Sequence, residues 1–371
     1  MGALQISGLT KRFKAETVLD DVSLQVPDGE TLILFGPSGA GKTVLLRCIA
    51  GVVDPDEGQV FIGEEDVTSV PPEGRDVGMA FQNFALFPHL SAYDNIASPL
   101  VAHRFAKERI RDTVDGVARL LKIDHVLSHA PRALSNGQKQ RTALARALAG
   151  QPGVLLLDDP LRNVDAKLRF EMRLELPRLL AEQGTTVVYV TQDYKEAMAL
   201  ADKIAILSDG RIMQVGRPDD IYLRPADLRI AEQFGDPSIN LLDVCPEADG
   251  SGVYVRISDK RVALEAGYEN TVGQKVVLGI RPESIRFSQM LDAIDVTIEA
   301  DTPLNEKIVT LTTTKRGREI LVSRPAESSG PGSKTTAIEI DASAAILFNR
   351  ETGKRIAPDM ASAAGGTRQV A

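Results

Sequence analysis

The chain has 371 residues, of which 43% are hydrophobic and 25% are charged, and its formal net charge is −8 at pH 7. This composition is ordinary for a globular protein of two or three domains and argues against disorder over most of the length. Because phosphate backbones attract clustered Lys and Arg, the negative balance argues against nucleic acid as the main partner.

The sequence predicts no disulfide framework, no zinc site and no membrane-spanning helix. Cys48 and Cys245 lie far apart and without metal-ligand spacing, so neither a disulfide framework nor a zinc site is expected. No stretch reaches the roughly 18 consecutive apolar residues of a membrane helix, and the start of the chain lacks the features of a signal peptide. We therefore expect a soluble, cytoplasmic protein. This expectation is compatible with docking on a membrane protein.

The chain opens with residues that alternate between apolar and polar types. Residues 4–9 and 18–26 show this pattern, which is typical of half-buried strands, and we expect two or three antiparallel strands here. Phe13 falls in the turn between them. An aromatic at this place either folds onto the sheet or stacks on a purine ring, and the residues leave both readings open.

Residues 36–43 read GPSGAGKT, after the apolar run 31–35 and before the helix-like stretch 44–50. This order of strand, glycine loop and helix is typical of a phosphate-binding P-loop. The glycines let the backbone turn tightly, so that several N–H groups converge on phosphate oxygens. Lys42 is expected to reach the β- and γ-phosphates and Thr43 to offer its hydroxyl to Mg²⁺, at the positive end of the following helix.

The next stretch, up to about residue 78, is rich in turn residues around short strands, and residues 79–82 read as a strand that ends at the polar Gln82. Residues 91–130 then carry helical periodicity, with apolar residues on one face. We predict a small helical subdomain over about residues 88–150.

A second possible phosphate site lies inside that subdomain. The sequence LSNGQKQR, residues 134–141, precedes a helix that we expect over Thr142–Ala149, which puts Ser135 and Gly137 at the helix N-terminus. A helix N-terminus suits a phosphate group, but a serine there also caps the helix. Taken alone, the capping interpretation of Ser135 is the better supported one.

Two apolar runs end in polar residues. Residues 154–159 read VLLLDD, and residues 186–193 read TVVYVTQD. Uniform apolarity marks strands buried on both faces of a parallel sheet, whose carboxyl ends form the ligand site of α/β proteins. Asp158 stands where a P-loop protein keeps a Mg²⁺-orienting carboxylate, and Asp159 where a base for the attacking water is expected.

The character of the sequence changes after about residue 236. Short alternating segments are separated by Gly, Pro, Asp and Asn, which predicts a separate small β domain of barrel or sandwich type over residues 236–358. The tail, residues 359–371, is small and polar, and we expect it to be disordered.

These motifs, in this order, carry a family resemblance. GPSGAGKT, Gln82, LSNGQKQR, LLLDDP, the loop at 161–165 and the strand end at 190–193 together resemble an ATPase subunit of an ABC transporter. The pattern is most similar to the sugar and polyol importer group that includes the maltose-transporter ATPase. The resemblance implies an α/β P-loop NTPase domain over residues 1–235, with an antiparallel β subdomain and the helical subdomain. An OB-like, all-β regulatory domain would follow.

The resemblance also implies roles for particular residues. Gln82 would reach Mg²⁺ and sense the membrane partner, Thr43 would bind the metal, and Asp158 would orient it through water. Two nucleotide domains would pair head to tail, so the signature segment of one subunit closes on ATP bound to the other. The implied ATP-binding residues are Phe13, which would stack on adenine, Gly36, Ser38, Gly39, Ala40, Gly41, Lys42, Thr43 and Val44, with Ser135, Asn136, Gly137 and Gln138 of the signature acting on the partner's ATP.

Four positions depart from the family pattern. Asp159 replaces the usual catalytic Glu, which sets its carboxylate back by about 1.5 Å, and a displacement of about 1 Å can cost on the order of 10²-fold in rate. Gln192 replaces the switch His and cannot carry positive charge. Asn136 stands in the signature where a glycine is usual, a change that the tolerance of Asn for positive φ makes acceptable. Arg162 adds a charge at the start of the D-loop.

The resulting expectation is the ATP-binding subunit of an importer for a sugar or polyol, glycerol included. It would lie at the cytoplasmic face of the membrane, with separate permeases and an external binding protein. The departures predict a weakly hydrolytic site, paired with a different ATPase subunit more readily than with a second copy. Two alternatives stay open: a soluble ABC protein outside transport, and a regulatory module that binds ATP without turnover. The short helical segment and the single ATPase domain count against the first.

Overall fold

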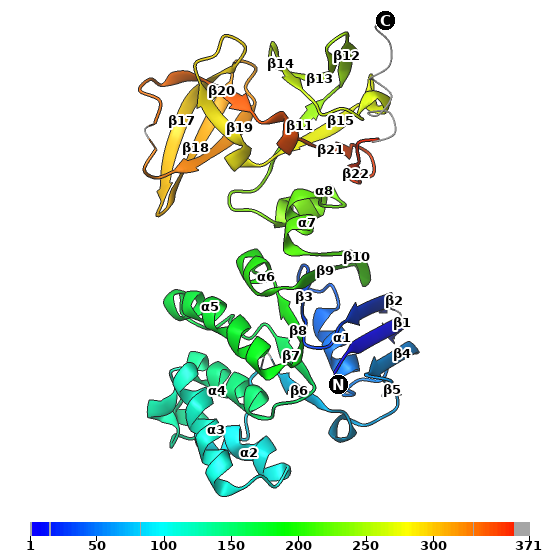
Figure 1. Cartoon of the computed structure of the whole chain (residues 1–371), viewed down its shortest axis with the longest axis vertical. Helices are drawn as coiled ribbons and strands as arrows, with labels where there is room; N and C mark the ends of the chain where they lie inside the picture. Colours follow the sequence, from blue (N-terminus) through cyan, green and yellow to red (C-terminus); the bar gives the residue numbers. More distant parts are fainter. Residues whose placement is uncertain (1, 15, 82, 329, 360–371) are drawn as a thin grey trace, which may run out of the picture. The chain divides into compact units, whose positions relative to one another are not determined.

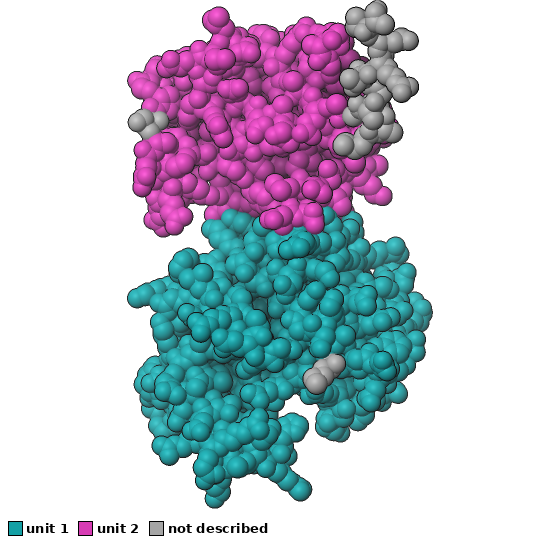
Figure 2. Space-filling view, in the orientation of Figure 1, with its two compact units in different colours: residues 1–218 teal, residues 219–371 magenta. Residues whose placement is uncertain are grey.

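The computed structural model describes residues 2–14, 16–81, 83–328 and 330–359. Within it the chain divides into two compact units, residues 1–218 and 219–371 (Figure 2). Each unit has its own hydrophobic core. The expected pairing of an α/β domain with an all-β domain is confirmed.

The first unit is built around a largely parallel sheet with strand order β10-β9-β3-β8-β7-β6 (Figure 1). Its strands, in that order, are Arg211–Gly216, Lys203–Ser208, Thr31–Phe35, Thr186–Thr191, Val154–Asp158 and Val77–Ala80. All neighbours pair in parallel except β10, which forms an antiparallel hairpin with β9. Strands β3, β7 and β8 are buried along their whole length, as their uniform apolarity predicted.

An antiparallel sheet lies against this core, with strand order β2-β1-β4-β5. Its strands are Glu16–Val26, Leu4–Phe13, Glu57–Ile62 and Glu65–Asp66. Helix α1, Lys42–Ile49, shares one buried cluster with residues of both sheets. The helix therefore holds its N-terminus, where the glycine loop ends, in a fixed position against the carboxyl ends of the parallel strands.

Helices α2 (Ala92–Ala102), α3 (Lys107–Leu120) and α4 (Asn136–Ala149) gather beyond the β6 edge of the parallel sheet (Figure 1). They confirm the helical subdomain. Helix α4 begins six residues earlier than the sequence predicted, because Ser135 and Gln138 form a capping box that starts it at Asn136. Asn136 is helical in this structure, so the tolerance of Asn for positive φ is not needed at this position.

Two further helices complete the first unit. Helix α5 runs over Ala166–Gln183, where the sequence analysis assigned no element, and the side chain of Asp165 caps it by accepting from the N–H of Leu168. Helix α6, Tyr194–Leu200, follows β8 and is capped by Asp193. These two caps place the loops after β7 and β8, which carry the polar residues of the predicted site.

The second unit consists of antiparallel strands preceded by two short helices, α7 (Pro218–Leu223) and α8 (Leu228–Gln233). Its sheets have strand orders β11-β15-β21-β22, β12-β13-β14 and β16-β20-β17-β18-β19. The strands are, from β11 to β22, Asn240–Val244, Glu247–Asp249, Gly252–Ile257, Lys260–Ala263, Val276–Ile280, Ile285–Ser288, Ile294–Leu304, Lys307–Thr314, Glu319–Pro325, Thr335–Ile340, Ile346–Asn349 and Arg355–Ile356.

The unit boundary falls after Pro218, whereas the sequence placed the end of the first domain at residue 235. Arg281, only 3% exposed, gives a physical reason for the difference. Its guanidinium donates to the backbone carbonyls of Ala231, Phe234 and Tyr222, and lies over the Tyr222 ring. A buried charge needs such partners, so the segment after residue 218 packs with the β unit. The predicted tail beyond residue 359 lies outside the described residues.

In the part of the chain that the structure describes, no helix combines the length and the apolarity needed to cross a membrane.

Candidate functional site

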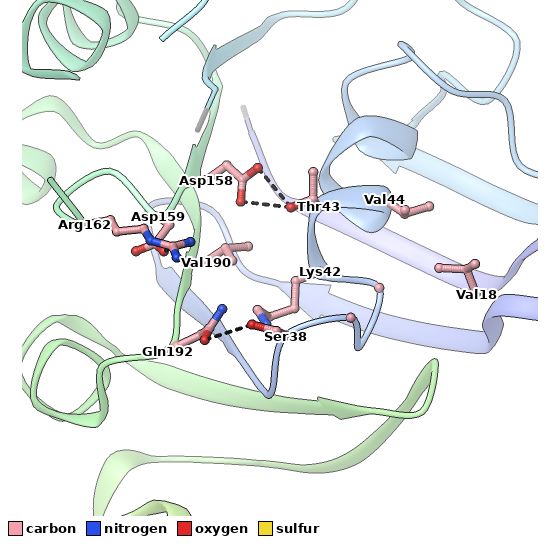
Figure 3. Close-up of a pocket in the computed structure, with 12 residues that line it drawn as sticks. Val18, Ser38, Lys42, Thr43, Val44, Asp158, Asp159, Arg162, Val190 and Gln192 are labelled. Atoms are coloured by element: carbon pink, nitrogen blue, oxygen red, sulfur yellow. Dashed lines mark hydrogen bonds and ion pairs between the residues drawn. The ribbon is translucent and has the colours of Figure 1, made fainter. Parts of the chain in front are cut away.

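A pocket of about 430 Å³ at the carboxyl ends of β3, β7 and β8 brings together many of the predicted site residues, among them Lys42, Asp158 and Gln192 (Figure 3). This is the edge at which open α/β sheets bind ligands. The pocket is lined by Val18, Ser38, Gly39, Gly41, Lys42, Thr43, Val44, Asp158, Asp159, Arg162, Val190 and Gln192.

The glycine loop joins β3 to α1 and requires glycine at two places for different reasons. Gly41 has φ 102°, a conformation that L side chains rarely adopt, and it precedes the first helical residue. At Gly36 an added Cβ would lie 2.1 Å from the carbonyl oxygen of Leu207 on β9. The loop therefore lies tightly against β9 and ends at the N-terminus of α1, a place that suits an anion.

Lys42 organises this loop. Its ammonium group donates to the carbonyls of Gly36 and Pro37, each at 2.6 Å, and the residue is only 6% exposed. Burial lowers the pKa of Lys42, while Asp159 and Asp158 act in the opposite direction. A buried cation held above a glycine nest is the arrangement that a polyphosphate group would satisfy.

Thr43 and Asp158 form the second part of the site. The Thr43 hydroxyl lies 3.0 Å and 3.2 Å from the two carboxylate oxygens of Asp158, and Figure 3 marks both contacts with dashed lines. Burial raises the pKa of the Asp158 carboxyl, and the bond from Thr43 opposes that shift. A hydroxyl and a carboxylate are oxygen ligands of the type that Mg²⁺ prefers, so the donor set fits this ion.

Asp159 lies beside Arg162, with 3.7 Å between a carboxylate oxygen of Asp159 and Nη1 of Arg162. Asp159 is largely buried, whereas more than half of the Arg162 side chain is exposed. Burial raises the pKa of the Asp159 carboxyl, and the nearby Arg162 charge opposes the shift. The backbone of Asp159 has φ 50°, a conformation that non-glycine residues keep only when their surroundings hold them in it.

Gln192 follows β8 and faces the glycine loop. Its side-chain oxygen accepts a hydrogen bond of 3.3 Å from the hydroxyl of Ser38 (Figure 3). The amide group therefore lies across the pocket from Asp158 and within reach of a ligand on the loop. Unlike a histidine, it keeps the same charge at every pH in the physiological range.

A buried network between β8 and α6 was not predicted from the sequence. Glu196 on α6 is 2% exposed and accepts hydrogen bonds from the hydroxyls of Tyr189, at 2.8 Å, and Thr191, at 2.9 Å. Burial raises the pKa of Glu196, and the two hydroxyl bonds oppose that shift. A tyrosine inside an otherwise apolar strand was the available signal, because a buried hydroxyl needs a partner.

Several predicted residues lie outside the pocket lining. Phe13, at the end of β1, is 44% exposed, with the Lys11 ammonium 5.3 Å from its ring. Within the glycine loop, Gly36 and the buried Ala40 do not line the pocket. Ser135, Asn136, Gly137 and Gln138 form the start of α4 and do not line the pocket. Gln82 lies outside the described residues.

The fold and the pocket define a P-loop nucleotide-binding protein with an appended β unit. Residues 19–162 match the family described as ABC transporter, and residues 235–285 match the family described as MalK OB fold domain. The chain is 43% identical over 300 residues to the trehalose/maltose import ATP-binding protein MalK of Thermococcus litoralis, covering 77% of this chain and 79% of the relative. The chain therefore belongs to the family of ABC transporter ATP-binding proteins.

Other relatives extend the likeness to nearly the whole chain. The sn-glycerol-3-phosphate import ATP-binding protein UgpC of Escherichia coli is 37% identical over 359 residues, which cover 96% of this chain and all of the relative. Among solved structures, the dimeric post-hydrolysis state of the ATP-binding cassette MJ0796 with ADP and Pi matches with a TM-score of 0.55. That match has 30% identity and covers 58% of this chain and 98% of the other.

Proposed function

We propose that this chain is the ATPase subunit of an ABC importer that couples ATP binding and hydrolysis to uptake of a sugar or polyol, glycerol included. The observation that carries the proposal is the convergence of Lys42, Thr43 and Asp158 on one pocket. The chain's similarity to two importer ATP-binding proteins supports the transport role, since both relatives are named for import.

Binding of ATP uses groups that are already held in place. The ammonium of Lys42 exchanges its carbonyl partners for phosphate oxygens, and the N–H groups of the glycine loop surround the same oxygens. Thr43 and Asp158, which lie within hydrogen-bond distance of each other, would hold Mg²⁺. When bound, Mg²⁺ neutralises part of the phosphate charge. Phe13 and Val44 complete the site on the side of the nucleotide base.

Hydrolysis depends on Asp159 and Gln192. Asp159 accepts a proton from the attacking water, and Gln192 donates a hydrogen bond toward the γ-phosphate. Two features slow this step. The Asp159 side chain is one carbon shorter than that of a glutamate. Its carboxylate also forms an ion pair with the guanidinium of Arg162, at 3.7 Å. An arginine partner stabilises the carboxylate and makes it a weaker base.

The low rate of hydrolysis expected at this site favours an asymmetric pair of ATPase subunits. In a homodimer both sites would carry Asp159 and Gln192, whereas an importer needs at least one site with a useful rate. With a different partner, the Ser135–Gln138 segment of this chain closes on the partner's ATP, where a full catalytic set does most of the turnover. The ATP on this chain's own loop is held by the partner's signature and hydrolysed slowly.

The remaining partners are integral-membrane permeases and, through them, an external binding protein. A groove of about 900 Å³ lies between β6 and the helical subdomain, with Phe81, Phe87 and Arg146 among its lining residues. It is large enough for the end of a partner helix and is lined in part by β6. The subunit then lies peripherally at the cytoplasmic face of the inner membrane.

A second candidate function is regulation by ATP occupancy without turnover. The ion pair between Arg162 and Asp159 favours it, because it occupies the carboxylate that hydrolysis needs. A soluble ABC ATPase outside transport is the other alternative.

The native complex, purified through a tag on this chain, separates these functions. We expect permeases and a second, different ATPase in the complex, together with ATP hydrolysis. Changing the partner's catalytic carboxylate to an amide should cause a large loss, and Asp159→Asn a small one. Brisk ATPase activity of this chain as a purified homodimer, abolished by Asp159→Asn, would refute the asymmetric arrangement. A complex without permeases would refute the transport role.

A further inference from the structure

A buried glutamine connects the signature segment of this chain to its own catalytic loop. Gln140 lies on α4, five residues after the cap Ser135, and is 3% exposed. Its side-chain N–H donates to the carbonyl of Asp159 at 2.8 Å, and its side-chain oxygen accepts from the N–H of Asn163 at 2.9 Å. The amide thus bridges two points of the loop that follows β7.

The first bridge helps to fix the peptide of Asp159. The N–H of Asp159 donates to the carbonyl of Val190 on β8 at 3.0 Å, while its carbonyl accepts from Gln140 and, at 3.3 Å, from the N–H of Arg162. These bonds hold a residue whose φ is 50°. Because strained backbone persists only where its surroundings hold it, Gln140 contributes to the direction of the Asp159 side chain.

The second bridge links the D-loop to the signature helix. The N–H of Asn163 is bonded to Gln140, and an added Cβ at Gly137 would lie 3.1 Å from the Asn163 carbonyl. The start of α4 therefore packs closely against this loop. Arg141, the next residue of the helix, donates to the carbonyls of Leu121 and Lys122, which ties α4 to the end of α3 within the helical subdomain.

We propose that Gln140 is a positioning residue that couples the Ser135–Gln138 segment to the placement of Asp159. The inference rests on the proposed function, in which that segment closes on the partner's ATP. When the helical subdomain moves to close on that ATP, α4 carries Gln140 with it. Because the side-chain N–H of Gln140 is bonded to the carbonyl of Asp159, the backbone of Asp159 moves as well. The site of this chain then responds to nucleotide in the partner's site through the hydrogen bond from Gln140 to the Asp159 carbonyl.

The test uses the complete complex and measures kcat and KM for ATP. If the second ATPase is a different chain, its catalytic carboxylate is changed to an amide, so that the remaining turnover comes from the pocket described above. Gln140→Met keeps the length of the side chain and removes both bonds. Thr142→Val is the matched control, because the buried Thr142 hydroxyl donates within α4, to the carbonyl of Gln138 at 2.8 Å.

We expect Gln140→Met to lower kcat by about tenfold or more with KM changed less than about twofold, since small misplacements of a reacting group act on rate. Thr142→Val should stay within about twofold of the parent complex in both parameters. Combining Gln140→Met with Asp159→Asn should be no slower than Asp159→Asn alone, because residues that act through one another are not additive. Losses that multiply, or equal losses for Gln140→Met and Thr142→Val, would overturn the proposal.

A second variant decides the matter even if Gln140→Met does not fold. In Gln140→Glu the ionised carboxylate offers no donor to the Asp159 carbonyl, whereas the protonated form restores both bonds. Its rate, divided by the parent rate at the same pH, should rise as the pH falls from about 8 to about 6. A flat ratio would contradict the positioning role. If the parent complex itself neither binds nor hydrolyses ATP, the proposed function is refuted, and this inference with it.

Discussion

Lengthening one side chain by one carbon should speed hydrolysis at this site. Asp159→Glu moves the carboxylate about 1.5 Å further into the pocket, and a misplacement of about 1 Å costs on the order of 10²-fold, or about 2.7 kcal/mol of barrier. Against this gain, the longer side chain must give up the ion pair with the half-exposed Arg162, which is worth about 1 kcal/mol at most. The difference of about 1.7 kcal/mol corresponds to an increase in kcat of about tenfold to twentyfold.

The assay is steady-state ATP hydrolysis by the complex, with the partner's catalytic carboxylate changed to an amide where the partner is a different chain. The KM for ATP should stay near the parent value, because Lys42 and Thr43 are unchanged. Asp158→Glu is the matched control: Asp158 is 3% exposed and already within hydrogen-bond distance of Thr43, so the same lengthening should lower the rate. An unchanged or lower kcat for Asp159→Glu, with ATP binding intact, would show that side-chain length does not limit this site.

Three further outcomes are expected. Lys42→Ala should weaken ATP binding in calorimetry by about 10-fold to 150-fold, the equivalent of about 1.5–3 kcal/mol for a charge-assisted contact, while Lys203→Ala, the same charge change in a surface pair with Glu30, leaves affinity unchanged. A chain ending at Pro218 should bind ATP as the full chain does, because every lining residue of the pocket lies between Val18 and Gln192. A shortened chain that is soluble but does not bind ATP would contradict this. Burial raises the pKa of Glu196 above its ordinary 4.5, so the stability that it contributes is present when it is protonated and is lost as the pH rises. In urea unfolding, the free energy of unfolding of Glu196→Gln should therefore rise relative to that of the parent from about pH 5 to about pH 8. A difference between the two free energies that does not change with pH would count against a raised pKa.

Much of the fold and part of the site could be predicted from the sequence because their signals are local. The glycine loop follows from residues 36–43 and their strand and helix neighbours, and the buried strands follow from uniform apolarity. Parallel strands meet the ligand at their carboxyl ends, so the residue pattern alone was enough to place Asp158 and Gln192 at one edge of the sheet. Helix α5 was missed, since its exposed Phe170 and Leu174 and its internal Pro177 obscure a helical pattern.

Local patterns were enough to predict the buried strands, the glycine loop and the two carboxylates at the end of β7, because each depends on neighbours within a few positions. Which distant side chains meet depends instead on the tertiary packing. The contact of Arg162 with Asp159 depends on the positive φ that turns the chain after β7, and the bonds of Gln140 depend on how α4 packs against that turn. The same holds for Arg281, whose bonds to the carbonyls of residues about 50 positions earlier draw α7 and α8 into the β unit. Such contacts satisfy buried polar groups across the fold, and no local pattern records which partner will be in reach.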